Sequence, residues 1–214
     1  MVDVHILKTK KDSKHLFEQC LKSLENEPIN IFIEDGIIGD TGLARHLAFQ
    51  KGDSEYVSYV DPDDLVVPGI FQKCMDAMTE DCAAVYSNEN LIDINGTFIR
   101  SGEQINQTWS YVKMKNNPKF VHHVVVYKRE LVERYSQNIK GFIMHSESLL
   151  NTLVSECGAK RFIHLNEVGY YWRLLTKDRK IDYKRELKVK NDIIKQFEME
   201  HSCTFTQHGL QKII

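Results

Sequence analysis

Two groups of acidic residues are the part of this 214-residue sequence best suited to chemistry. Glu34 and Asp35 follow one apolar run that is typical of a strand, and Asp61, Asp63 and Asp64 follow another. Carboxylates this close in sequence repel one another unless a cation or a network of hydrogen bonds neutralises them. A divalent ion that also holds phosphate oxygens meets that need, so the pattern predicts a Mg²⁺ or Mn²⁺ site for a phosphate-bearing substrate. The alternative is a surface turn in which Asp61 or Asp63 only caps the next helix.

The elements that must position these carboxylates alternate between strands and helices. Apolar runs predict strands over residues 4–7, 29–33, 56–60 and 83–86, and helical periodicity predicts helices over 13–24, 43–48 and 68–78. Such alternation indicates a single α/β domain, with a mixed, mainly parallel sheet flanked by helices and joined by right-handed crossovers. Ligands of such a sheet bind at the carboxyl ends of its strands, which is where both acidic groups fall.

The second half of the sequence is less regular. Asn95 and Gly96 predict a two-residue hairpin turn. Later runs predict strands over 120–127, 161–165 and 168–173 and helices over 146–157 and 182–200. Because His122 and His123 lie within the first of these strands, we expect their side chains to point to opposite faces and not to share a metal ion.

Composition excludes several other classes of protein. Apolar residues make up 42% and charged residues 27% of the chain, which is typical of a soluble globular protein. No apolar run approaches the roughly 18 residues that span a bilayer, and the first residues lack the apolar segment of a secretory signal. We therefore expect a cytoplasmic protein without a transmembrane segment. The five cysteines are scattered without a C-x-x-C pair, which argues against a disulfide framework or a structural zinc site.

The second acidic group also lies within a longer motif. Residues 44–46 read A-R-H and residues 52–64 read G-D-S-E-Y-V-S-Y-V-D-P-D-D. This stretch resembles the A-R-N … G-x-Y-I-x-F-L-D-x-D-D signature of family-2 glycosyltransferases with the GT-A fold. Residues 31–36 and 40–42 (I-F-I-E-D-G and D-T-G) are similar to that family's V-V-D-D-G-S-T-D-G-T, and residues 84–87 (A-V-Y-S) to its V-x-Y-S-D. The resemblance implies a GT-A, Rossmann-like fold and a nucleotide-sugar donor, first of all a UDP-sugar.

The resemblance also implies roles for individual residues. Asp61 and Asp63 correspond to the family's D-x-D pair, which holds Mn²⁺ or Mg²⁺ together with the donor diphosphate, and Asp63 would thereby act in catalysis. Contacts with the nucleotide-sugar are implied for a wider set, namely Thr9, Glu34, Asp35, Arg45, Asp61 and Arg173. The sequence departs from the family pattern in several places, with I-I at residues 37–38 in place of Ser-Thr and Gly39 as an insertion before Asp40. It has K-T-K at residues 8–10 in place of a P-x-Y-N turn, and L-L at residues 174–175 where the family shows a histidine.

Glu147 is the candidate general base. The family places an E-D pair before an apolar helix, and Ser146-Glu147 is the nearest match in this sequence. An acceptor hydroxyl must lose a proton as it attacks the anomeric carbon, and a carboxylate can accept that proton. The alternative is a helix N-terminal glutamate that only interacts with the helix dipole. His145 would be the substitute for the family's third metal ligand, and Arg173 and Lys177 are candidates for contacts with the diphosphate.

Charge divides the sequence into two halves. Residues 1–107 carry 9 Lys and Arg against 19 Asp and Glu, a net charge of −10, whereas residues 108–214 carry 19 against 11, a net charge of +8. We expect a donor half over 1–107, an acceptor half over 108–180 and a basic helical tail over 181–214. A basic half with interleaved aromatic residues suits a polyanionic acceptor.

Together these features predict a metal-dependent, inverting glycosyltransferase that moves a sugar from a nucleotide-sugar to a hydroxyl group. Two acceptors remain open: a hydroxymethylated base in phage DNA, flipped out of the duplex, and a surface polysaccharide or lipopolysaccharide. Two other classes compete with this interpretation. One is a sugar-nucleotide nucleotidylyltransferase, which would need a glycine-rich loop after the first strand. The other is a non-catalytic module that only binds a nucleotide-sugar.

Overall fold

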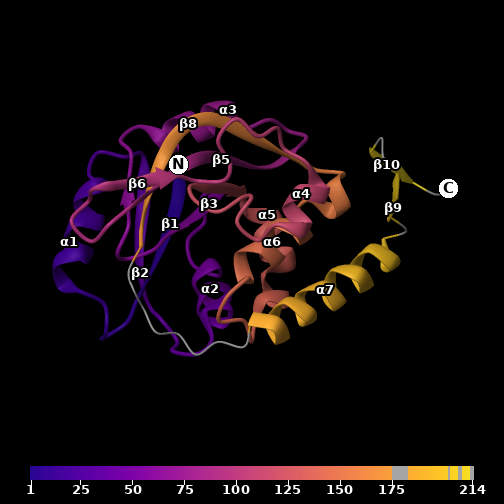
Figure 1. Ribbon diagram of the computed structural model, residues 1–214, viewed down its shortest axis with the longest axis horizontal. Helices are drawn as coiled ribbons and strands as arrows, with labels where there is room; N and C mark the ends of the chain where they lie inside the picture. The colour runs from indigo at the N-terminus through magenta and orange to yellow at the C-terminus, as the bar shows by residue number, and fades with distance from the viewer. Residues whose placement is uncertain (175–182, 202, 207–208, 213–214) are drawn as a thin grey trace.

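One mixed β-sheet forms the centre of the molecule (Figure 1). The computed structural model describes residues 1–174, 183–201, 203–206 and 209–212. Within these residues the sheet has eight strands in the order β2-β1-β3-β7-β5-β8-β4, with β6 paired to β5. The strands are β1 (Val2–Lys8), β2 (Ile29–Asp35), β3 (Tyr56–Val60), β4 (Leu65–Val66), β5 (Cys82–Ile92), β6 (Phe98–Ser101), β7 (Val125–Lys128) and β8 (Arg161–Arg173), besides a separate hairpin of β9 (Cys203–Thr206) and β10 (Gly209–Lys212).

Parallel pairing joins two groups of strands within this sheet. β1 pairs in parallel with β2 and β3, which brings the carboxyl ends of these three strands together, and β5 pairs in parallel with β8. β7 lies between β3 and β5 and is antiparallel to both. The expected mixed α/β sheet is confirmed, and the acidic groups at the end of β2 and after β3 lie at one edge of it.

Helices cover both faces of the sheet. Buried residues of α1 and α3, such as Cys20 and Phe71, share a core with one face. Buried residues of α2, α4, α5, α6 and α7 share a larger core on the other face, and α7 enters it through Ile194 and Phe197. The helices are α1 (Lys14–Ser23), α2 (Thr41–Phe49), α3 (Ile70–Ala77), α4 (Tyr111–Asn116), α5 (Arg129–Tyr135), α6 (Ser146–Val154) and α7 (Tyr183–Glu200), with short 3₁₀ helices at Ser136–Ile139 and Glu156–Gly158.

The start of α2 is fixed against the loop that precedes α6. Asp40 caps the helix, because its Oδ1 accepts hydrogen bonds from the backbone N–H of Leu43 at 2.8 Å and of Gly141 at 2.9 Å. The N–H of Gly42 donates to the carbonyl oxygen of Phe142 at 2.8 Å. A Cβ atom at Gly42 would lie 1.7 Å from the carbonyl oxygen of Ile139, so only glycine permits this approach.

Several elements differ from those that the sequence predicts. The expected strand over 120–127 begins only at Val125, and the expected strands over 161–165 and 168–173 form one strand, β8, whose pairing with β5 contains shifts of register. The expected helix over 146–157 ends at Val154, because Glu156 and Cys157 have left-handed backbone conformations. Among the described helices, none combines the length and the apolar character needed to cross a bilayer.

The prediction that His122 and His123 point to opposite faces is wrong. The two residues precede β7, so their side chains do not alternate as those of a strand would. Their ring centroids lie 4.0 Å apart with the rings nearly edge to face.

A buried histidine on β1 makes the stability of the fold sensitive to pH. His5 is 1% exposed, its ring stacks on Phe32 at 5.0 Å, and neither ring nitrogen has a hydrogen-bond partner among the described residues. Burial, together with the positive charge of Arg129, lowers the pKa of His5 to about 4.

We expect the free energy of unfolding to fall as the pH is lowered from 7 to 4. Below about pH 6.5 His5 becomes protonated in the unfolded chain, whereas in the folded protein it stays neutral until about pH 4. Folding therefore becomes less favourable as the pH falls through this range. The variant His5→Phe keeps the aromatic stacking without the titration. Urea unfolding at a series of pH values should show that the free energy of unfolding falls less in this variant than in the parent protein, by about 2–3 kcal/mol at pH 4. Equal losses in both proteins would contradict this assignment.

Candidate active site

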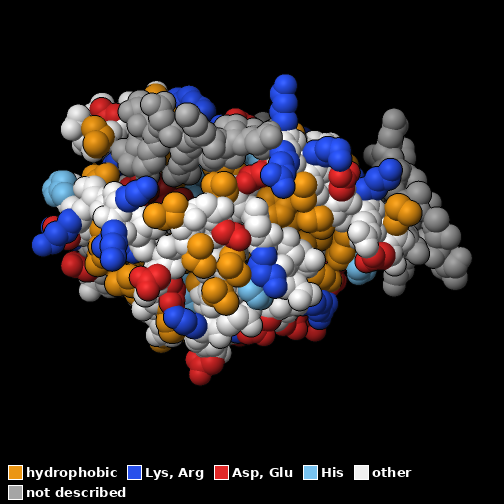
Figure 2. Space-filling model, turned by 90° about the horizontal axis from the view of Figure 1, so that it is seen from below, with side chains coloured by type: hydrophobic (Ala, Val, Ile, Leu, Met, Phe, Trp, Pro, Cys, Tyr) orange, Lys and Arg blue, Asp and Glu red, His pale blue; other side chains and the backbone are white. Residues whose placement is uncertain are grey.

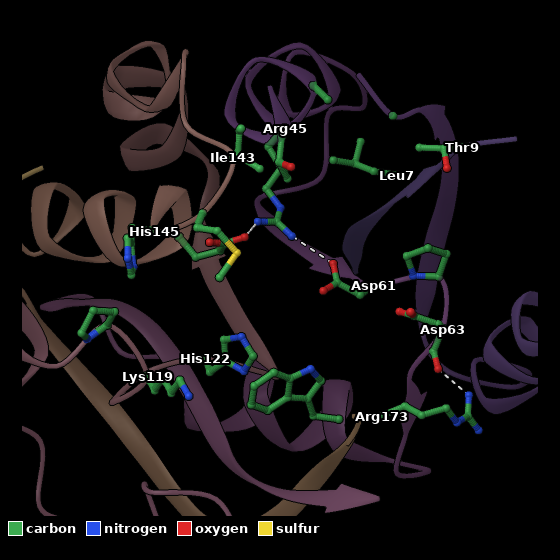
Figure 3. A pocket seen from close by; sticks show the side chains of 18 of the residues that line it. Leu7, Thr9, Arg45, Asp61, Asp63, Lys119, His122, Ile143, His145 and Arg173 are labelled. Atoms are coloured by element: carbon green, nitrogen blue, oxygen red, sulfur yellow. Dashed lines mark hydrogen bonds and ion pairs between the residues drawn. The ribbon is translucent and has the colours of Figure 1, made fainter. Parts of the chain in front are cut away.

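A cavity of about 680 Å³ opens at the carboxyl ends of β1 and β3 (Figure 3). Its lining includes residues that follow β1, β2 and β3, residues of the loop before α6, and Trp172 and Arg173 at the end of β8. The sequence-predicted site residues that line it are Thr9, Arg45, Asp61, Asp63, Glu147 and Arg173. His145, the expected substitute for a third metal ligand, also lines this cavity.

Two of the predicted nucleotide-binding residues do not line the cavity. Glu34 forms an ion pair with Lys51, and Asp35 is exposed at the end of β2. Gly36 lines the cavity at this position instead. A Cβ atom at Gly36 would lie 2.7 Å from the side chain of Thr9, so the glycine lets the ends of β1 and β2 approach each other closely.

Arg45 joins carboxylates that are far apart in the sequence. Its Nη2 donates to Oδ1 of Asp61 at 3.0 Å, and its Nη1 forms an ion pair with Glu147 (Figure 3). Nη1 also lies 3.4 Å from Oγ of Ser146, and the guanidinium stacks over the ring of Tyr59 at 3.9 Å. Only 3% of Arg45 is exposed, so its guanidinium lies buried in the wall of the cavity. From there it holds the carboxylates of Asp61 and Glu147 in place.

Asp64 supports the turn that carries Asp61 and Asp63. It is buried, and it accepts hydrogen bonds from the hydroxyl of Tyr170 at 2.9 Å and from the N–H of Arg173 at 2.6 Å. The N–H of Asp61 donates to the same Tyr170 hydroxyl at 3.2 Å. Burial, followed by the charges of Asp61 and Asp63, raises the pKa of Asp64 well above its usual range.

Arg173 is an anchor of this turn. Its Nη1 donates to the backbone carbonyl of Asp63, and its Nη2 donates to Oε1 of Gln19 on α1 at 2.9 Å. It is 3% exposed and lines the edge of the cavity. Lys177, the other candidate for a diphosphate contact, lies outside the described residues.

A group of possible metal ligands surrounds Asp61. Among the described residues, Asp61, Asp64 and His123 offer ligand atoms that all lie within 4.8 Å of one another. Two carboxylates and an imidazole form a donor set that divalent ions of the first transition row accept. Burial lowers the pKa of His123 well below its usual range, which keeps the imidazole in the neutral form that binds metals. The group shares Asp61 with the predicted Asp61–Asp63 pair.

Sequence reasoning missed His123 because it placed the residue in a strand. The ring of His123 stacks on Tyr170 at 4.5 Å, and its Nε2 lies 3.7 Å from Oδ2 of Asp61. Its Nδ1 is buried and finds no hydrogen-bond partner in the part of the chain that the structure describes. The only sequence signal is the H-H pair itself, whose orientation depends on where β7 begins.

The far wall of the cavity comes from the basic half of the chain. Nδ1 of His122 lies 2.9 Å from Oε2 of the buried Glu89, and its ring meets the ring of Trp172 edge to face at 4.8 Å. Nζ of Lys119 lies 5.6 Å from the centre of the Trp172 ring. This wall therefore presents a cation, an imidazole and an aromatic surface to a ligand.

Comparison with solved structures identifies the fold of the chain. Residues 1–349 of S. aureus TarS, crystallised with UDP-GlcNAc, superimpose with a TM-score of 0.68 and 13% sequence identity, over 92% of this chain and 66% of that one. The complex of the same fragment with UDP gives a TM-score of 0.58 and 13% identity, over 97% and 73% of the two chains. The chain has the GT-A glycosyltransferase fold.

A relative in sequence is named for the biosynthesis of teichoic acid. The chain is 25% identical over 169 residues to the minor teichoic acid biosynthesis protein GgaB of Bacillus subtilis (strain 168). The match covers 72% of this chain and 18% of GgaB, so the chain spans about a fifth of that protein's length. No protein-family model matches the sequence.

We predict that Arg45 and Glu147 are energetically coupled. Removing one partner leaves the other charge poorly compensated, so the double variant Arg45→Gln, Glu147→Gln should be more stable than the sum of the single losses predicts. The expected coupling energy is about 0.5–3 kcal/mol in urea unfolding. Pairing Arg45→Gln with Glu198→Gln on α7 provides the control, and its effects should add. Additive losses for Arg45 and Glu147 would show that the ion pair does not organise the site.

Proposed function

We propose that this chain is the catalytic unit of a metal-dependent, inverting glycosyltransferase that moves a sugar from a UDP-sugar to a polyanionic cell-surface glycan. The observation that carries the proposal is the pair of carboxylates held by Arg45. Asp61 and Glu147 come from distant parts of the sequence and line one cavity at the carboxyl ends of the strands, in a chain with the GT-A fold.

The cavity suits a nucleotide-sugar. Its volume of about 680 Å³ lies within the range of roughly 300–1,000 Å³ that is usual for small-molecule sites. The wall with Thr9 and Gly36 would contact the nucleotide, and Asp61 and Asp63 would lie beside the diphosphate. TarS was crystallised with UDP-GlcNAc, which makes this molecule the first donor to test.

The proposed reaction is a single displacement at the anomeric carbon. Asp61 and Asp63, with Asp64 and His123 beside Asp61, are the residues that would hold Mn²⁺ or Mg²⁺. When bound, such an ion neutralises the negative charge that develops on the leaving diphosphate. Glu147 would accept the proton of the acceptor hydroxyl as its oxygen bonds to the anomeric carbon and the bond to the diphosphate breaks. Attack from the side opposite the leaving group inverts the anomeric centre.

The acceptor we propose is a phosphate-rich surface polymer. GgaB is named for teichoic acid biosynthesis, and the far wall of the cavity with Lys119, His122 and Trp172 fits a negatively charged glycan. We accordingly assign the donor side to residues 1–107 and the acceptor side to residues 108–180. Neither relative supports the alternative acceptor, phage DNA. On the face in Figure 2, the described Lys and Arg side chains are interspersed with acidic and apolar ones.

The proposal predicts metal-dependent binding of a UDP-sugar. UDP-GlcNAc with Mn²⁺ should raise the melting temperature of the protein, because a ligand that binds only the folded state stabilises it. Asp63→Ala should lose this shift and all transfer. Glu147→Gln should keep the shift and lose about 10²–10⁴-fold in turnover, because it retains the size of the side chain without its basic oxygen.

Controls separate the parts of this prediction. Both variants should match the parent protein in circular dichroism. Without ligand, Asp63→Ala should also keep the parent melting temperature, whereas Glu147→Gln should melt at a lower temperature because Arg45 loses a charged partner. Transfer of labelled sugar is expected to a phosphate-rich cell-wall polymer and not to hydroxymethylated duplex DNA. If no UDP-sugar shifts the melting temperature with metal, the proposed function is wrong. Unchanged turnover in Glu147→Gln would refute only the assignment of the base.

A further inference from the structure

Glu186, a glutamate outside the cavity, holds part of the cavity wall. It lies in the first turn of α7, and its carboxylate accepts hydrogen bonds from two successive backbone N–H groups. Oε1 accepts from Ile143 at 2.7 Å, and Oε2 accepts from Met144 at 2.8 Å. Both of these residues line the cavity. Hydrogen bonds to a charged acceptor are about twice as strong as those between neutral groups.

The loop that Glu186 holds leads directly into the candidate base. His145 follows it with a left-handed backbone conformation (φ 60°), α6 begins at Ser146, and Glu147 lies in the first turn of that helix. The side chain of His145, the N-cap residue of α6, makes no capping hydrogen bond, in contrast to that of Asp40 at the start of α2. The direction in which α6 leaves the loop is therefore set by contacts with neighbouring elements.

Those contacts come from two sides. From the side of α2, Asp40 accepts from Gly141, and Gly42 donates to Phe142. From the side of α7, the carboxylate of Glu186 accepts hydrogen bonds from the backbone N–H groups of the next two residues of the loop. The loop is thus held between the helix that carries Arg45 and the helix that carries Glu186.

α7 has other contacts that keep it in place. Near its C-terminal end, Glu198 accepts hydrogen bonds from the Tyr111 hydroxyl at 2.9 Å and from Nζ of Lys115 at 2.7 and 2.8 Å. Ile194 and Phe197 are buried in the core beneath α7. These contacts hold α7 in position without Glu186. The feature that depends on Glu186 is therefore the loop before α6.

We propose that Glu186 is a positioning residue: by fixing the N–H groups of Ile143 and Met144, it sets the orientation in which α6 presents Glu147 to the cavity. The catalytic consequence rests on the proposed function, whereas the structural part does not. A displacement of about 1 Å in a reacting group is enough to slow a reaction by about 10²-fold, so a small change in the loop should be visible in turnover.

A pair of matched variants tests this proposal. Glu186→Gln replaces one carboxylate oxygen by an amide that cannot accept a hydrogen bond, and Glu198→Gln makes the same change at the other end of α7. In hydrogen exchange, the amides of Ile143 and Met144 should exchange at least about tenfold faster in Glu186→Gln and at the parent rate in Glu198→Gln. Glu186→Asp keeps the charge on a shorter side chain and should give a smaller increase.

Kinetics with UDP-GlcNAc and Mn²⁺ provide the second measurement. Glu186→Gln should lower kcat by at least about tenfold with little change in donor affinity, and Glu198→Gln should retain the parent kcat. Parent exchange rates and parent kcat in Glu186→Gln would overturn the proposal. So would an equal loss of kcat in Glu198→Gln, because the effect would then come from loosening α7 as a whole. If the parent protein binds no UDP-sugar, the proposed function fails, and the exchange rates still decide whether Glu186 fixes the loop.

Discussion

A single buried guanidinium determines how the two sides of the cavity meet. Arg45 is almost fully enclosed, and a charge in such a place is tolerated only when it is paired and hydrogen-bonded. Asp61, Glu147 and the face of Tyr59 provide those partners. Because Asp61 follows β3 and Glu147 lies in the first turn of α6, the ion pairs of Arg45 also fix the donor-side carboxylate relative to the candidate base.

The surrounding fold can be understood as a set of supports for this arrangement. The cap of Asp40 and the close approach at Gly42 place α2, and hence Arg45, against the loop before α6. On the other side, Tyr170 and Arg173 of β8 hold the turn after β3 through Asp64 and the backbone of Asp63. β8 reaches this turn because it pairs along the whole of the long strand β5. The acidic turn is thus held by side chains of a strand that is distant in the sequence.

Local patterns predicted much of this structure. The alternation of apolar runs with helical periodicity predicted the strands and helices of the first 92 residues except the short strand β4. The D-P-D-D turn and Arg45 were recognisable because they lie close together in the sequence. What the sequence did not predict depends on contacts between distant residues. The orientation of His123 depends on where β7 begins, and the burial of Arg45 depends on Glu147, which lies 102 residues later. No local pattern links Glu186 to the loop before α6, because those hydrogen bonds span more than 40 residues.

The main conclusion is that Arg45 holds the donor-side carboxylate and the base in one site. A crystal structure of the protein with UDP-GlcNAc and Mn²⁺ is the most direct test of it. We predict an anomalous manganese signal beside Asp61, the diphosphate next to it, and Glu147 facing the anomeric carbon while still paired with Arg45. Manganese bound away from Asp61, or an anomeric carbon out of reach of Glu147 with the Arg45 pair intact, would contradict it.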